Sequence, residues 1–291
     1  MNILFADEFC LQAQHLRWSY DFLGLENLLQ ENRATQSYRQ EKTIAMYEAI
    51  CASFTQPPDK QVIEKFQNTL QLDYAGLPIE KYLLDAQLYV ELTQVYTDLQ
   101  QYDLEFKVHK KAEVAFNKAI ELYEQYYSEE WWLQRWFGEL YIFIQYVGAR
   151  VHLRPAKSDA ARDYARRALD MGKKINSTLM RPHCYIILAI CFSRRRSVKN
   201  FEQELTKAKF AAEDAGIAEQ LAYYFKFMDK LLLLHKDQIW DYRGKKLVEY
   251  TEDEVLKIYR KVQNAKIGNW IDPEFREKNL WGAKDRPLEL V

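Results

Sequence analysis

The residue types that most often do chemistry in proteins stand singly in this chain. Its five histidines are scattered, at His15, His109, His152, His183 and His235. His183 and Cys184 are neighbours, but adjacent residues on a helix point about 100° apart and rarely bind one metal ion. The phosphate-binding patterns GxxxxGK and GxGxxG and the zinc pattern HExxH do not occur. The sequence therefore predicts a protein that is not an enzyme and that holds no metal ion and no cofactor.

The four cysteines predict buried, reduced thiols. They show no CxxC spacing, and Cys184 and Cys191 lie among apolar neighbours on one face of an expected helix. The first residues, MNILFADEFC, carry acidic side chains where a secretory signal would carry basic ones. No run of about 18 apolar residues occurs, so no membrane-spanning helix is expected. These features predict a cytoplasmic protein without a membrane partner.

The charged residues are distributed unevenly, although the formal net charge is only −1. Residues 79–149 carry 6 basic and 12 acidic side chains, whereas residues 150–210 carry 15 basic and 5 acidic ones. A local excess of cations attracts phosphates or acidic peptides electrostatically. The basic segment 150–210 is therefore the strongest local signal for a binding surface.

The basic segment contains seven candidate partner-binding cations: Arg162, Arg166, Lys173, Arg194, Arg195, Arg196 and Lys199. The first three share one face of a predicted helix, opposite the small residues Ala161, Ala165, Ala168 and Gly172. The other four come at the end of the next predicted helix, where positive charge suits the helix dipole. Such a surface fits an acidic protein, the acidic half of this same chain, a second subunit or nucleic acid. Because no recognised nucleic-acid motif occurs, protein is favoured.

Three tryptophans complete the candidate partner-binding set. Trp131 lies at the start of an aromatic-rich predicted helix and falls toward its flank, away from the stripe formed by Trp132, Trp136, Phe143 and Tyr146. Trp270 and Trp281 lie in a C-terminal segment with little other predicted structure. Tryptophan is a common interface anchor. The two C-terminal tryptophans either dock back onto the helices as a cap or bind another protein.

The elements that must position these residues are helices. Nine glycines and seven prolines are too few for a turn-rich β fold, and apolar residues recur at helical spacing. The pattern predicts helices over 6–32, 36–55, 59–72, 79–101, 103–127, 129–153, 158–176, 181–197, 200–215 and 217–236. Short links between helices of similar length favour antiparallel neighbours. Apolar and polar residues alternate over 238–250, which predicts a small β-hairpin or an extended arm. A further helix is predicted to follow, to about residue 265.

Several of these predicted helices carry a family pattern. An aromatic, a leucine, a small residue and an aromatic stand at relative positions 0, 3, 4 and 7 in two of them: Tyr89, Leu92, Thr93, Tyr96 and Tyr185, Leu188, Ala189, Phe192. Alanine–aromatic–alanine follows in a third, at Ala112, Phe116 and Ala119, and in part at Ala161, Ala165, Ala168 and at Ala208, Ala211. The chain thus resembles the tetratricopeptide repeats, with second-helix alanines spaced by 49 and 43 residues instead of the usual period of about 34.

The resemblance implies an all-α fold, with a stretched α-solenoid of antiparallel hairpins over 79–236. An N-terminal helical segment, 1–78, would precede it, and a C-terminal cap and tail, 237–291, would follow. Such a fold implies a non-catalytic protein–protein interaction module or adaptor within a larger complex. The basic segment supports an alternative, a regulatory or defence protein that binds nucleic acid or a nucleotide signal. A homo-oligomer is compatible with both.

Overall fold

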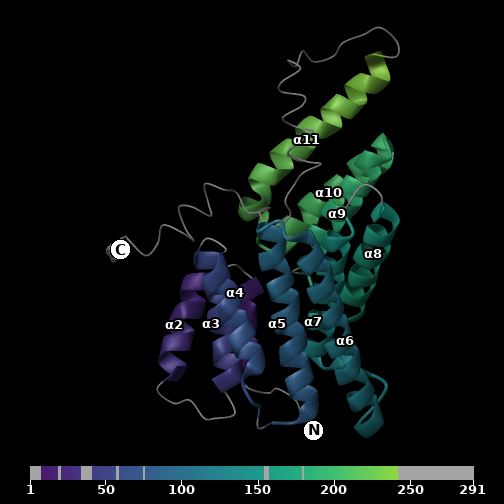
Figure 1. Cartoon of the computed structure of the whole chain (residues 1–291). Coiled ribbons are helices and arrows are strands. Elements are labelled where there is room, and N and C mark those ends of the chain that lie inside the picture. The colour runs from purple at the N-terminus through teal and green to yellow at the C-terminus, as the bar shows by residue number, and fades with distance from the viewer. Residues whose placement is uncertain are drawn as a thin grey trace. The chain divides into compact units, whose positions relative to one another are not determined.

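The computed structural model describes residues 8–18, 21–33, 41–56, 59–74, 76–153, 157–178 and 180–241 (Figure 1). Every regular element in these ranges is a helix, which confirms the predicted all-α class. None of the helices in these ranges is long and apolar enough to cross a membrane. The chain divides into two compact units, and the boundary between Val147 and Gly148 lies inside helix α7. Each unit is described by itself below.

The C-terminal expectations fall mostly outside the described residues. The helix predicted to end at residue 236 continues to Asp241, so the hairpin or arm predicted from residue 238 is wrong at its start. The remainder of that segment, the predicted helix after it, Trp270 and Trp281 all lie outside the described residues.

The described part of unit 1 contains seven α-helices and one short 3-10 helix. They are α1 (Glu8–Trp18), α2 (Phe22–Arg33), α3 (Glu41–Thr55), α4 (Lys60–Gln71), α5 (Pro78–Asp98), α6 (Tyr102–Tyr126), η1 (Trp131–Leu133) and the first part of α7 (Arg135–Val151). Asp59 caps the N-terminus of α4, because its side chain accepts a hydrogen bond from the Val62 amide at 2.9 Å. Helix α3 packs against α2, α4 and α5, so it is buried almost all round.

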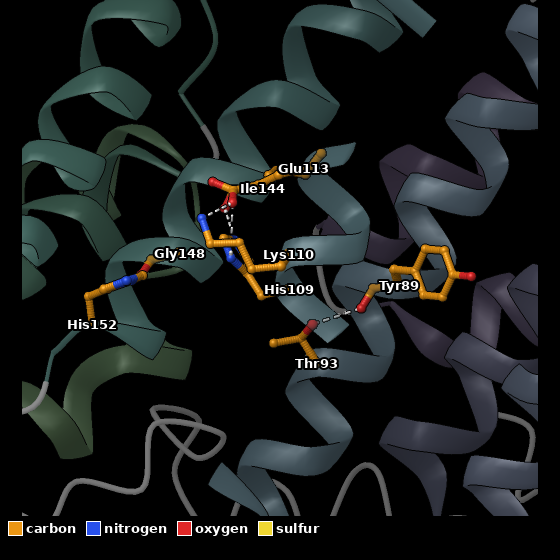
Figure 2. Close-up of polar contacts among 8 residues, drawn as sticks. All are labelled: Tyr89, Thr93, His109, Lys110, Glu113, Ile144, Gly148 and His152. Atoms are coloured by element: carbon orange, nitrogen blue, oxygen red, sulfur yellow. Dashed lines mark hydrogen bonds and ion pairs between the residues drawn. The ribbon is translucent and has the colours of Figure 1, made fainter. Parts of the chain in front are cut away.

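Helices α5 and α6 form the most extensive helix pair of unit 1. Ala112, Phe116 and Ala119 of α6 are buried, and the Phe116 ring packs against Trp131 and Tyr141. Figure 2 shows two polar contacts of these helices: within α5 the Thr93 hydroxyl donates to the Tyr89 carbonyl at 2.8 Å, and between α6 and α7 His109 Nε2 lies 3.0 Å from the Ile144 carbonyl oxygen. Because a carbonyl only accepts, the His109 ring nitrogen must donate. This isolated histidine therefore joins two helices.

The described part of unit 2 contains four helices after the end of α7. They are α8 (Ser158–Lys174), α9 (Arg181–Arg194), α10 (Val198–Asp214) and α11 (Ala218–Asp241), and each packs against the next. The predicted small-residue face of α8 is confirmed, because Ala161, Ala165, Ala168 and Gly172 are all buried. His152 is also structural, since Nδ1 lies 2.8 Å from the carbonyl oxygen of Gly148, both residues being drawn in Figure 2. The His152 ring also stacks on the Tyr164 ring.

Four helices end in turns of the same type, and in each turn one residue adopts the left-handed backbone conformation. These residues follow α5, α8, α9 and α10 and are Gln100, Asn176, Arg196 and Gly216, with φ of 61°, 53°, 55° and 70°. In each turn the amide of the residue after the left-handed one donates to the carbonyl five positions earlier, at 2.9–3.0 Å; the Ser197 amide, for example, donates to the Phe192 carbonyl at 3.0 Å. Glycine is the residue that tolerates this conformation best, yet only one of the four is glycine.

We expect Gln100→Gly to raise the free energy of unfolding by about 0.5–1 kcal/mol, because a left-handed residue with a Cβ is strained. Gln100 is exposed, so the change removes no buried contact. Gly216→Ala should have the opposite sign, since an added Cβ meets nothing within 4 Å and only the backbone conformation is strained. Urea denaturation of the three proteins measures both changes. Equal stability of all three would contradict the strain argument.

Candidate functional site

Five of the seven predicted cations lie together at one end of unit 2. We call this set the basic end: Arg162, Arg194, Arg195, Arg196 and Lys199. It forms because α9 ends beside the start of α8, where the Cys191 thiol donates to the Ser158 carbonyl at 3.6 Å. Lys173 does not belong to it, since 11 residues of helix separate Lys173 from Arg162 by about 16 Å. Arg166 lies between them on the exposed face of α8.

The cations of the basic end differ in how far they are already engaged. The Arg194 guanidinium donates to the Leu153 carbonyl, and burial lowers the pKa of Arg194 below its ordinary value. Asp159 pairs with both Arg195 and Arg162, the latter at 3.2 Å. Arg196 and Lys199 are exposed and form no ion pair with any residue that the structure describes. These two carry most of the charge that the basic end offers to another molecule.

Two cations of the segment 150–210 pair with acidic residues of unit 2 that lie outside the segment. Lys209 pairs with Asp229 at 2.6 Å, and Arg181 lies 3.8 Å from Asp214. Lys207 pairs with Glu204 at 2.8 Å and Lys173 lies 4.0 Å from Asp170, but these two acids are already included in the count of 15 basic and 5 acidic side chains. Ion pairs between described residues therefore offset only part of the positive excess of this segment.

The expectation that Trp131 lies on the flank of a helix is wrong. The segment predicted as one helix over 129–153 is split into η1 and α7, and Trp131 is only 9% exposed. Its ring packs against Phe116 at 5.7 Å and Tyr141 at 5.5 Å between ring centroids. Trp131 therefore belongs to the core of unit 1 and offers little surface to a partner.

A groove that the sequence did not reveal crosses unit 1 over helix α3. It has a volume of about 660 Å³. Its floor is the face of α3 that carries Ala45, Ala49 and Ala52, spaced by about one helical turn. The walls come from α2, through Glu26, Leu29, Gln30 and Arg33, and from α4, through Lys65, Asn68, Thr69 and Leu72.

The groove can bind a polar chain because its walls present both donors and acceptors. Arg33 Nε donates to Glu48 Oε1 at 2.8 Å, which ties α2 to α3 at one place. Gln30, Lys65 and Asn68 are exposed on the rims and make no side-chain hydrogen bond or ion pair to any described residue. The small floor residues let a backbone approach closely, and the rim groups provide hydrogen bonds. No sequence signal marks this groove, because its three sides come from separate helices.

The buried cysteines and the buried Ser193–His235 pair are structural groups. Cys51, Cys184 and Cys191 are buried and form no disulfide with another described residue, as predicted, and burial raises the pKa of Cys191 to about 11. Ser193 Oγ and His235 Nε2 lie 2.9 Å apart in a hydrogen bond, but both side chains are nearly excluded from solvent. A nucleophile must be reached by its substrate, so this serine–histidine contact does not constitute an active site.

Acidification should destabilise unit 2 through His235. Burial lowers the pKa of His235 below its ordinary value of about 6.5, and the charge of Arg196 lowers it further. As the pH falls through the ordinary pKa of histidine, His235 is protonated in the unfolded chain before it is protonated in the folded one. The free energy of unfolding therefore falls as pH drops from 7 to about 5. Urea denaturation at several pH values should show this slope in the wild type and a shallower one in His235→Gln. Identical slopes in both proteins would exclude His235 as the cause.

Comparisons with known proteins did not identify a relative. No family model matches the chain, and neither curated proteins nor solved structures contain a match. Within the described ranges, no three or more histidine, cysteine, aspartate or glutamate side chains are grouped so that they could hold a metal ion.

Proposed function

We propose that this protein is a non-catalytic interaction module in which the groove over α3 holds a segment of a partner protein. The observation that carries the proposal is the groove itself, with a volume of about 660 Å³, an alanine floor and polar rims. An extended or helical segment would place its backbone close to Ala45, the partly exposed alanine of the floor, and its polar groups against Lys65 and Asn68. The buried thiols favour a reducing compartment, and we therefore place the protein in the cytoplasm.

We also propose that the helices are tetratricopeptide-like hairpins stacked as a solenoid. Three features support this. The positions of the family pattern in α5 and α9 include buried small residues, Thr93 and Ala189. The matching alanines of α6, α8 and α10 are buried against neighbouring helices. The same left-handed turn also follows α5, α8, α9 and α10. A recurring turn geometry agrees with a repeat architecture, although many unrelated helices also end in this way.

The groove is tested by filling it. Ala45 is only half-buried, so Ala45→Arg should leave the fold intact while its side chain obstructs the floor. Tagged protein purified from its native host should bring down a stoichiometric partner, and Ala45→Arg should lose it. Ala222→Arg, at an exposed position of α11, is the matched control and should keep the partner. A protein that purifies alone, or a partner that Ala45→Arg retains, would overturn the proposal.

Nucleic-acid binding is the second candidate function, and the exposed Arg196 and Lys199 of the basic end favour it. Affinity for short RNA or DNA should then fall steeply as salt rises, because counterions are released on binding. Arg195→Glu, Arg196→Glu and Lys199→Glu combined should abolish it. Absence of binding to both nucleic acids at low salt would eliminate this candidate.

A further inference from the structure

An acidic surface with exposed apolar side chains lies at the turn between α6 and α7 in unit 1. We call it the acidic corner and define it as Glu124, Tyr126, Tyr127, Glu129, Glu130 and Leu133. Tyr126, Tyr127 and Leu133 are 65%, 40% and 69% exposed. Large side chains exposed this far contribute little to the core of unit 1. Exposed apolar groups rimmed by charge are typical of docking surfaces.

Ring packing and hydrogen bonds hold the turn that carries the acidic corner. The ring of Tyr127 lies 5.2 Å from that of Tyr123, whose hydroxyl oxygen accepts a hydrogen bond from Gln134 Nε2 at 3.3 Å. The Ser128 hydroxyl oxygen accepts from the Glu130 amide at 2.9 Å and shapes the turn itself. Trp131 anchors the turn by packing against Phe116. The exposed groups are therefore presented by a backbone that is held in place, which lowers the entropic cost of binding.

The carboxylates of the acidic corner form no ion pairs with the described residues of unit 1. Glu124, Glu129 and Glu130 are exposed and form no ion pair with any residue in the described ranges. Their neighbours in the chain are engaged, since Glu121 pairs with Lys118 at 3.0 Å and Glu139 with Arg135 at 2.7 Å. The corner therefore presents three uncompensated negative charges beside tyrosine rings. A guanidinium fits such a surface, because it hydrogen-bonds carboxylates and stacks on aromatic faces.

The chain itself carries the complementary surface. The basic end exposes Arg196 and Lys199 without ion pairs to described residues, and Arg195 is exposed beside them. The net charge of the chain is only −1, so two whole molecules repel one another little, whereas opposite charges are concentrated in residues 79–149 and 150–210. A molecule with small net charge and strong charge separation is suited to pairing with its own copies.

We propose that the acidic corner of one copy of this protein binds the basic end of a second copy. The two contacting surfaces differ, so the association is head-to-tail, and it continues into chains unless a ring closes. The proposal is independent of the groove over α3, which neither surface includes. A protein that binds a partner in its groove and also associates with itself would hold several copies of that partner together.

Sedimentation velocity on the full chain tests the association. At about 50 mM salt the sedimentation coefficient should rise with protein concentration, and at about 500 mM salt it should remain that of a monomer, because salt screens exposed charges. Glu129→Lys with Glu130→Lys should abolish the rise, and so should Arg196→Glu with Lys199→Glu. An equimolar mixture of these two double variants should associate again, because each supplies the charge that the other has lost.

The apolar part of the acidic corner is tested without changing charge. Tyr126→Ala with Leu133→Ala should weaken association by at least about tenfold, which corresponds to about 1.4 kcal/mol. Leu23→Ala, an equally exposed leucine on α2, is the matched control and should have no effect. Circular dichroism of every variant verifies the fold. Wild-type protein that stays monomeric at low salt and high concentration overturns the proposal, as does failure of the mixed variants to associate. Neither result bears on partner binding in the groove.

Discussion

Replacing Glu91 with alanine should lower the free energy of unfolding by about 3–5 kcal/mol, the largest effect that we expect from a single change. Arg17 Nε and Nη2 donate to the two oxygens of Glu91, at 3.1 and 2.9 Å. The side chains are only 3% and 1% exposed, and the guanidinium lies 4.4 Å from the centroid of the Phe54 ring. Without Glu91, the Arg17 charge would stay buried without its carboxylate, in a largely aromatic environment.

The double variant Arg17→Met with Glu91→Leu should recover most of this loss. Both charges then disappear together, and apolar side chains of similar size fill the space, so no desolvated charge remains. The matched control is the exposed ion pair Arg33–Glu48, where Glu48→Ala should cost no more than about 0.5–1 kcal/mol. Urea denaturation measures all the variants. A double variant as unstable as Glu91→Ala would contradict this account and would show that the buried pair is itself stabilising.

Lys42→Met should have the second-largest effect, a loss of about 2–4 kcal/mol. Lys42 is fully buried; its ammonium group donates to the carbonyls of Leu70 and Leu72 at 3.2 Å and forms an ion pair with an oxygen of Asp85 at 2.8 Å. One ammonium group thereby joins α3, the end of α4 and α5. Methionine has a similar length but no donor, so it would leave the two carbonyls and the carboxylate with fewer partners.

Lys81 supplies the matched control for Lys42, because it pairs with the same carboxylate from an exposed position, at 3.2 Å. Lys81→Met should change the free energy of unfolding by no more than about 0.5 kcal/mol. Thermal or urea denaturation of both variants under one set of conditions gives the comparison. Equal effects of the two substitutions would mean that burial and the two carbonyl contacts of Lys42 contribute nothing to the free energy of unfolding.

Local features of the structure were largely predictable from the sequence. Apolar spacing placed most of the helices within a few residues of their ends, because helix periodicity depends only on neighbours along the chain. The small-residue face of α8 was predictable for the same reason. The helix expected over 129–153 was not, since its first turn folds back so that Trp131 can pack against Phe116. No proline or glycine precedes that break to signal it. The helix expected over 6–32 was wrong in one respect, since the structure divides it into α1 and α2.

Two of the four left-handed residues at the helix ends carry no signal in the sequence, unlike Asn176 and Gly216. Gln100 and Arg196 adopt left-handed conformations that a reader of sequence expects at glycine or asparagine. The hydrogen bonds of the turn and the packing of the flanking helices offset the strain at these residues. A conformation imposed by the surroundings cannot be read from the residue that adopts it.

The sequence by itself determined the helical class and the separation of acidic from basic segments, because both follow from residue type and local spacing. Only the tertiary structure decided which charges are buried, which are paired and which remain available. Arg17 and Glu91 are 74 residues apart in the chain and yet form a buried pair, whereas Arg196 and Lys199 stay exposed. The same holds for the groove over α3, whose walls come from separate helices. Desolvation and pairing depend on distances between remote segments, and those distances exist only in the folded chain.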